Sequence, residues 1–213
     1  MPFIEKNGVR LLFIHVPKTG GTSVENWLAS LAPLQFFCHG LPDFSRCTPQ
    51  HYRMRDFRTI FQPGYFDYAF MIVRDPYARI ESEYRMQNAL AGGGFFKAGP
   101  HFSLWLEQGL RNQKINPHHL DNHLRPQWEF GGDEVEVFKF EEGLERALVR
   151  VAELLGVAAP EELPRELSTG GHDRVHWDRV DRILVEEHYR RDFEEFSYPR
   201  APMLPEKPLE NSA

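Results

Sequence analysis

A lysine, two glycines and three hydroxyl residues follow the first apolar run of the chain. The segment reads His15-Val16-Pro17-Lys18-Thr19-Gly20-Gly21-Thr22-Ser23. Glycines let a backbone approach an anion closely, and the free amides at the start of a helix, together with the helix dipole, favour negative charge there. Lys18 adds a full positive charge, and the hydroxyl groups add donors. The segment therefore predicts a strand-loop-helix unit that binds a phosphate or sulfate group.

A second anion site is predicted where another apolar run ends. Arg74 directly follows the run 68–73, and Ser82 comes eight residues later, on a helix expected over 76–90. An arginine fork and a hydroxyl two helical turns further on can hold one phosphate group together. Two anion sites at successive strand ends imply a ligand with two phosphate-like groups, and a 3′,5′-bisphosphorylated adenosine fits that description better than ATP.

The two motifs resemble those of a known family. The string from Phe13 to Ser23 closely resembles the 5′-phosphosulfate loop of sulfotransferases that use 3′-phosphoadenosine-5′-phosphosulfate. The resemblance is greatest to the carbohydrate-directed, family 2-like branch with the heparan and chondroitin enzymes. It spans about 11–198, and the two phosphate motifs are its specific part. It implies donor binding by Pro17, Lys18, Thr19, Gly20, Gly21, Thr22 and Ser23 at the phosphosulfate and by Arg74 and Ser82 at the 3′-phosphate.

The resemblance also implies a reaction, the transfer of a sulfuryl group to a hydroxyl acceptor that we expect to be a glycan. Sulfuryl transfer resembles phosphoryl transfer in needing in-line positioning and neutralisation of charge on the leaving oxygen. Lys18 is expected to stabilise that bridging oxygen as a positioned cation. Because this charge takes the place of a metal ion, no metal is expected.

The acceptor hydroxyl must lose a proton, and a histidine is the natural base at neutral pH. His39 is one candidate, because it ends an expected strand over 34–38 at the edge where ligands bind in open α/β folds. Heparan-type relatives have His-Gly-His here, whereas this chain has His39-Gly40-Leu41. His123 is the second candidate, in a stretch similar to a His-x-x-Pro-Gln motif near the acceptor cleft of carbohydrate sulfotransferases. The choice between the two histidines stays open.

Further polar residues are expected on the acceptor side. Arg125 and Gln127 share the stretch of His123 and are expected to contact the acceptor. Arg53 and Arg55 either bind an acidic sugar chain or belong to a solvated charged face. Arg79 has two open roles as well, a cofactor contact or an ion pair within its own helix.

Two other polar stretches invite a functional interpretation. His119, Asp121 and His123 have spacing that could hold a metal, but Pro117 and Pro126 favour an irregular loop, in which that spacing carries little meaning. The loop 168–174 is expected to close over the nucleotide, as similar late loops do in the family. Trp105, Trp128 and Trp177 are expected in the core rather than against an adenine ring.

Two alternative functions are weighed against sulfuryl transfer. A nucleotide or small-molecule kinase would need Gly-x-x-x-x-Gly-Lys-Thr, but His15 and Gly21 stand where the first glycine and the lysine are required. A non-catalytic module that binds the bisphosphonucleotide is the other alternative. The presence of Lys18 together with His39 argues against it.

Composition narrows the class of protein. The chain has 213 residues, of which 41% are hydrophobic, and 25 basic against 31 acidic residues give a net charge of −6. A surface of that charge does not attract nucleic acid in general, so any anion site must be local. Two cysteines are too few for a disulfide framework, and no apolar run approaches the ~20 residues that span a bilayer. We expect a cytoplasmic protein with free thiols and no membrane span.

Hydrophobic periodicity then supplies the elements that position these residues. Strands alternating with helices predict an α/β fold, a P-loop-like three-layer sandwich with a mainly parallel sheet. We expect one domain over 1–197 and a loosely ordered, proline-rich tail over 198–213. The expected strands are 10–15, 34–38, 68–73 and 134–140, and the expected helices are 24–31, 76–90, 102–110, 141–155 and 178–193.

Overall fold

The computed structural model describes residues 2–38, 40–90, 101–160 and 175–200. Its sheet has four strands in the order β1-β2-β3-β4, formed by Phe3–Lys6, Val9–Ile14, Tyr68–Val73 and Val135–Lys139. Strands β2, β3 and β4 run parallel, and β1 pairs with β2 in the antiparallel direction. The mainly parallel α/β sheet predicted from the sequence is confirmed.

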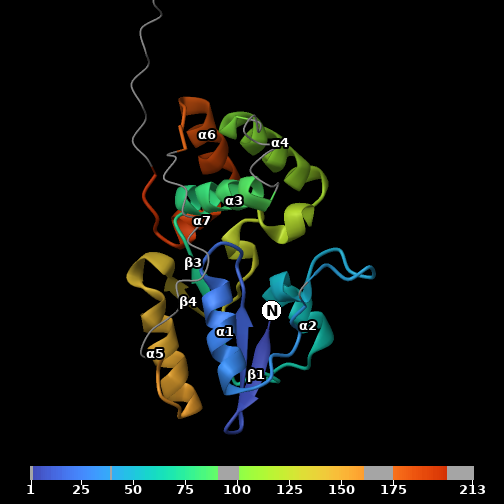
Figure 1. The fold of residues 1–213 in the computed structure, drawn as a ribbon, viewed down its shortest axis with the longest axis vertical. Helices are drawn as coiled ribbons and strands as arrows, with labels where there is room; N and C mark the ends of the chain where they lie inside the picture. The colour runs from blue at the N-terminus through green and yellow to red at the C-terminus, as the bar shows by residue number, and fades with distance from the viewer. Residues whose placement is uncertain (1, 39, 91–100, 161–174, 201–213) are drawn as a thin grey trace, which may run out of the picture.

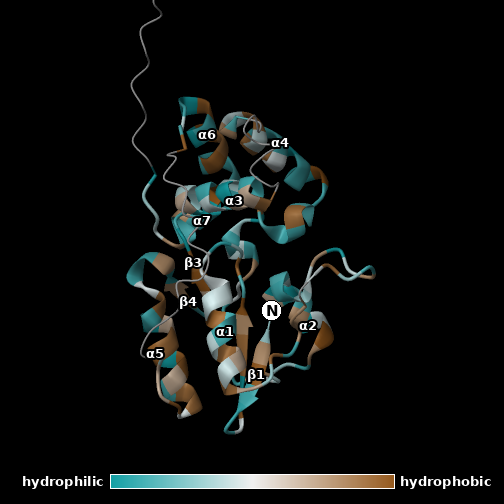
Figure 2. Cartoon of the chain, viewed as in Figure 1, coloured by the Kyte–Doolittle hydropathy of each residue, from teal (hydrophilic) through white to brown (hydrophobic). Residues whose placement is uncertain are grey.

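Both faces of the sheet are buried, so the fold has three layers. On β2, Leu11 and Phe13 pack on one face with α1 (Gly21–Leu31) and α5 (Leu144–Leu155). Their neighbours Leu12 and Ile14 pack on the other face. Side chains alternate along a strand, so a continuous apolar run supplies two cores at once. Figure 2 shows hydrophobic residues along the strands, whereas the helices carry residues of both kinds.

The remaining helices cover the second face and the end of the sheet. Figure 1 shows α3, α4 and α6 grouped at one end of the sheet, which is the end where β3 leads into α3. No described helix has the length and apolar character needed to cross a membrane. The helices not yet given are α2 (Met54–Ile60), α3 (Pro76–Leu90), α4 (Phe102–Ile115), α6 (Arg179–His188) and α7 (Arg190–Glu195), with short 3₁₀ turns η1 (Pro49–His51), η3 (His119–Asn122), η4 (Gln127–Glu129) and η5 (Phe140–Glu142).

The prediction of a strand over 34–38 is wrong. Only Gln35 pairs there, through an isolated bridge to Phe3. Phe36 has a φ of 55°, a left-handed conformation that interrupts an extended chain. Its ring instead packs against Phe3 and Phe57, so the apolar run fills a core and builds no strand.

Strand β1 is not among the strands that hydrophobic periodicity predicts. It forms a hairpin with β2 through Asn7 and Gly8, whose φ angles of 51° and 81° are both positive. An Asn-Gly pair between two apolar runs is a strong hairpin signal, because both residues tolerate that conformation. The signal was therefore present in the sequence.

The ends of several other helices differ by a few residues between the prediction and the structure. Helix α5 begins at Leu144 rather than 141, because Gly143 has a φ of 89°. It ends as expected at Leu155, and the left-handed Gly156 follows it. The single helix expected over 178–193 is two helices, since the chain leaves helical geometry at Tyr189. Helix α4 continues to Ile115, five residues beyond the expected end.

Candidate active site

The loop between β2 and α1 has the backbone geometry of an anion site. Gly20 caps the helix with a φ of 84°, which turns the chain into α1. A Cβ on Gly21 would lie 2.1 Å from Nε2 of His15, so only glycine fits there. The ring of His15 cannot easily move away, because its Nδ1 pairs with Glu25 at 2.6 Å in the protein interior. The amide of Ser23 already donates to the carbonyl of Gly20 at 3.2 Å, and the two amides before it, at the start of α1, point out of the helix, where they can bind an anion.

Lys18 lies at the mouth of this loop, half-buried and in the left-handed region with a φ of 69°. Its Nζ donates to Sδ of Met86 on α3, at 3.2 Å. Burial lowers the pKa of Lys18 below its usual value; Glu83 opposes that effect and Arg74 adds to it. A cation held by a weak sulfur acceptor is well suited to neutralise charge on a bound anion.

Arg74 connects the two predicted anion motifs. Its Nη1 donates to the carbonyl oxygen of Lys18 at 3.2 Å, and its guanidinium lies over the ring of Phe140. Its Nε is buried and has no hydrogen-bond partner in the described part of the chain. A buried donor without a partner costs free energy, so this nitrogen is suited to an anionic ligand. The structure therefore brings Lys18 and Arg74 to one location.

Gln127 supports Arg74 and does not reach an acceptor. Its Oε1 accepts from the backbone N–H of Arg74 at 2.8 Å, and its Nε2 donates to the carbonyl oxygen of the same residue at 2.7 Å. Gln127 is fully buried, and its own backbone N–H donates to Asp192. Burial raises the pKa of Asp192 to about 6. The predicted acceptor contact of Gln127 is therefore replaced by a role in holding the end of β3.

His123 is held from two sides by α3. Its Nδ1 pairs with Oε2 of Glu83 at 2.6 Å, and its backbone carbonyl accepts from Nη1 of Arg79 at 2.9 Å. Arg79 also donates to the carbonyl of Arg125 and is buried, so it has neither of its two predicted roles. Glu83 and Arg79 lie one helical turn apart and therefore face the same side of α3. Together they hold His123 beside the lysine loop, since Glu83 also interacts with Lys18.

Three histidine rings lie in a row beside the loop. The ring centroids of His15 and His51 are 5.0 Å apart, and those of His51 and His123 are 4.9 Å apart. His51 is buried, and its Nδ1 pairs with Asp121 at 2.8 Å. Burial lowers the pKa of His51, so its ring stays neutral near pH 7.

Part of this row could ligate a metal ion. His51, Asp121 and His123 place ligand atoms within 4.8 Å of one another. Both carboxylate oxygens of Asp121 are already engaged, however, because they accept from the backbone and hydroxyl of Thr48 as well as from His51. We interpret Asp121 as the residue that orients His51. His119, which the sequence grouped with these residues, is not part of the cluster.

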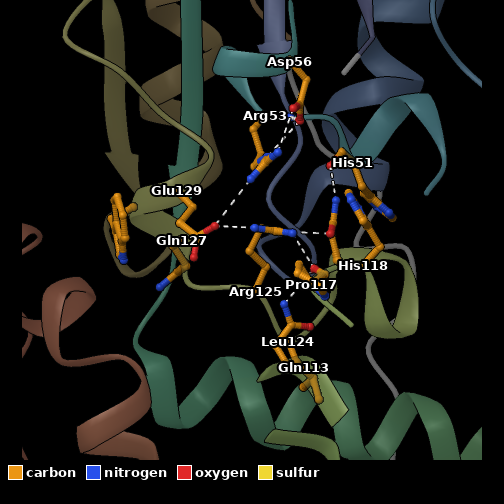
Figure 3. Close-up of polar contacts among 12 residues, drawn as sticks. His51, Arg53, Asp56, Gln113, Pro117, His118, Leu124, Arg125, Gln127 and Glu129 are labelled. Carbon is orange, nitrogen blue, oxygen red and sulfur yellow. Dashed lines mark hydrogen bonds and ion pairs between the residues drawn. The ribbon is translucent and has the colours of Figure 1, made fainter. Parts of the chain in front are cut away.

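Two of the arginines predicted to bind the acceptor are engaged inside the protein. Figure 3 shows Arg125 between Glu129 and Pro117, whose carbonyl it binds. Its Nε also donates to Oδ1 of Asn122 at 3.0 Å, and its side chain is 4% exposed. Arg53 binds Asp56 through two hydrogen bonds and caps α2. These contacts correct their predicted role, because neither guanidinium is available to an acidic sugar chain. Arg55 is exposed, as that role requires.

The other predicted residues are distributed as follows. Thr19 is buried, and its hydroxyl donates to the carbonyl of Val16, so its side chain stabilises the loop itself. Thr22 and Ser23 lie in the first turn of α1, and Ser82 is half-buried on α3 next to Glu83. His39 and the loop 168–174 lie outside the described residues. Sequence reasoning missed Glu83 and Met86 as neighbours of Lys18, although their spacing places them on one helix face.

A comparison with protein-family models gives a match that covers residues 2–199 and is described as the sulfotransferase family. The chain belongs to the sulfotransferase family. The match covers both anion motifs, and sulfotransferases generally use 3′-phosphoadenosine-5′-phosphosulfate as donor. No curated protein and no solved structure matched the chain. This sulfotransferase is thus a transferase that acts on a hydroxyl-bearing acceptor.

Proposed function

We propose that this sulfotransferase moves a sulfuryl group from 3′-phosphoadenosine-5′-phosphosulfate to a carbohydrate hydroxyl. The observation that carries the proposal is the hydrogen bond from Arg74 to the carbonyl of Lys18. It brings a loop suited to one anion next to an arginine suited to another, and the donor has a phosphosulfate and a 3′-phosphate. The orphaned Nε of Arg74 is a donor that such a ligand would satisfy.

The donor supplies an activated sulfuryl group, and the remaining chemistry belongs to side chains of this protein. Lys18 neutralises the charge that develops on the bridging oxygen as the S–O bond to the phosphate breaks. Arg74 and the α1 amides hold the phosphates in line with the acceptor.

His123 is our proposed base among the described residues. The pKa of Glu83 is below its usual value. Burial raises this pKa, but His123, Gln87 and Lys18 together lower it by more than burial raises it. An ionised carboxylate only accepts hydrogen bonds, so Nδ1 of His123 carries the proton. In the neutral ring Nε2 then has a lone pair, which accepts the acceptor's hydroxyl proton as the new S–O bond forms. His39 stays a second candidate.

Calorimetry and transfer assays test this function together. We expect adenosine 3′,5′-bisphosphate to bind without a divalent ion, and ATP with Mg²⁺ to bind more weakly. A labelled-sulfate screen across glycans and small alcohols should reveal an acceptor. Lys18→Ala should reduce turnover about 10²- to 10³-fold and change bisphosphate affinity by less than about tenfold. A preference for ATP with Mg²⁺, or undiminished turnover in Lys18→Ala, would defeat the proposal.

The two histidines are compared in the same assay. His123→Ala should lower kcat about 10²-fold or more and leave bisphosphate affinity unchanged. His39→Ala is the variant with which His123→Ala is compared, because it makes the same substitution at the other candidate base. A larger loss in His39→Ala than in His123→Ala would transfer the base role to His39.

A further inference from the structure

Glu83 is a buried carboxylate that sits between the two groups assigned to the reaction. It is 1% exposed, yet it lies on the site side of α3 and pairs with His123 at 2.6 Å. Its other oxygen accepts from Nε2 of Gln87 at 2.7 Å. Both oxygens therefore accept hydrogen bonds from side chains, and these bonds fix the carboxylate in place.

The same carboxylate acts on Lys18. Lys18 extends along α3 to Met86, three residues beyond Glu83, and interacts with Glu83 electrostatically. A second cation, Arg74, adjoins the lysine through the lysine carbonyl. Two cations in a partly buried site repel each other, and a nearby anion offsets that repulsion before a ligand binds.

We propose that Glu83 is a positioning residue that keeps the proton of His123 on Nδ1 and balances the charge of Lys18. This inference rests on the function proposed above. Because its side chain is 1% exposed and both its oxygens accept from protein side chains, Glu83 acts through His123 and Lys18 and does not itself contact a ligand. Its charge helps keep Lys18 protonated but opposes binding of an anionic ligand. The proposal therefore predicts effects of opposite sign on turnover and on binding.

Glu83→Gln separates these effects, because glutamine keeps the size of the side chain but has no charge and no fixed acceptor for His123. We expect kcat to fall at least about tenfold and the affinity for adenosine 3′,5′-bisphosphate to rise about tenfold. Burial and Arg74 lower the pKa of Lys18, and the variant removes the group that opposes them. The basic limb of the pH–rate profile should therefore move to lower pH. Glu83→Asp, which restores the charge on a shorter side chain, should return affinity towards the wild-type value.

Nitrogen-15 NMR of the histidines gives a readout that does not require activity. In the unliganded wild-type protein, His123 should carry its proton on Nδ1. In Glu83→Gln the side-chain amide can rotate and donate instead, so the Nε2–H tautomer should become populated. If the wild type carries the proton on Nε2, the positioning role is overturned, whatever the protein transfers.

Glu25→Gln is the matched control, because Glu25 is also a buried carboxylate paired with a histidine at 2.6 Å. It should lower thermal stability and leave the tautomer of His123 unchanged. Weaker bisphosphate binding in Glu83→Gln, in a protein with wild-type circular dichroism, would overturn the charge-balancing role. Failure of the wild type to bind any adenosine bisphosphate would defeat the proposed donor while leaving the NMR result on Glu83 readable.

Discussion

The side-chain amide of Gln127 binds the backbone of Arg74 in both directions, accepting from its N–H at 2.8 Å and donating to its carbonyl at 2.7 Å. A single buried side chain thus fixes the point where β3 ends and the second anion motif begins. Because the guanidinium of Arg74 starts from that fixed backbone, Gln127 acts on the ligand without touching it.

Gln127→Ala should therefore weaken both stability and donor binding. Leaving two buried backbone groups unpaired costs about 1–3 kcal/mol each. We expect chemical denaturation to show a lower free energy of unfolding and calorimetry to show weaker bisphosphate binding. Unchanged bisphosphate affinity in a folded Gln127→Ala protein would show that Arg74 does not depend on this clamp.

Gly21→Ala tests the close approach of the loop to His15. The new Cβ would lie 2.1 Å from a ring that Glu25 holds in place, so either the ring or the start of α1 must shift. Such overpacking costs about 1–3 kcal/mol. We expect a matching fall in the free energy of unfolding and loss of bisphosphate binding. Gly40→Ala is the control, because nothing lies within 4 Å of its Cβ position and its stability should not change.

Acid should destabilise the protein through His51. Its pKa is lowered in the folded state by burial, with His123 and His15 adding to the effect and Asp121 opposing it. The unfolded chain binds a proton near pH 6.5, whereas the folded protein does not. The stability contributed by the neutral ring is therefore complete above pH 6.5 and is lost as the pH falls, by about 1.4 kcal/mol per pH unit.

Denaturation curves between pH 7 and pH 5 measure this loss. His51→Gln should be less stable than the wild type at pH 7, because the contact with Asp121 is weakened. The variant should nevertheless lose less stability on acidification. Parallel pH profiles for the two proteins would rule out His51 as the responsible group.

An acidic acceptor should distinguish the exposed Arg55 from the internal arginines, because only an exposed arginine can bind it. Arg55→Ala should raise the KM for an acidic glycan several-fold, because this side chain is exposed, and leave thermal stability unchanged. Arg125→Ala should lower the melting temperature by several degrees, because it leaves the buried groups around Pro117 and Asn122 without their donor. The check is to measure the KM of the wild type and of Arg55→Ala at increasing salt concentration, because salt competes with a charge contact to the glycan. An acceptor KM that responds to Arg125→Ala at unchanged stability would restore the sequence-based interpretation.

Local features of the chain predicted much of the fold. The run Tyr68–Val73 forms a strand because it is apolar throughout, and Pro76 begins a helix because its missing N–H is not needed there. The same local reasoning failed at Phe36, whose environment is a cluster of rings from distant parts of the chain. Apolar character alone does not distinguish a strand from a loop that fills a core.

The sequence by itself determined where a loop and a strand end suited to anions would form, because glycines, a lysine and a helix start lie within one short segment, and because an arginine follows a buried strand. Only the tertiary structure decided which charged residues are available. Arg53 and Arg125 resemble free cations in sequence, but in the fold both pair with Glu129, which lies far from Arg53 in the chain, and Asp56 and the carbonyl of Pro117 engage them further. Glu83 became important for the same physical reason, since packing α3 against the loop brings its carboxylate to Lys18 and His123.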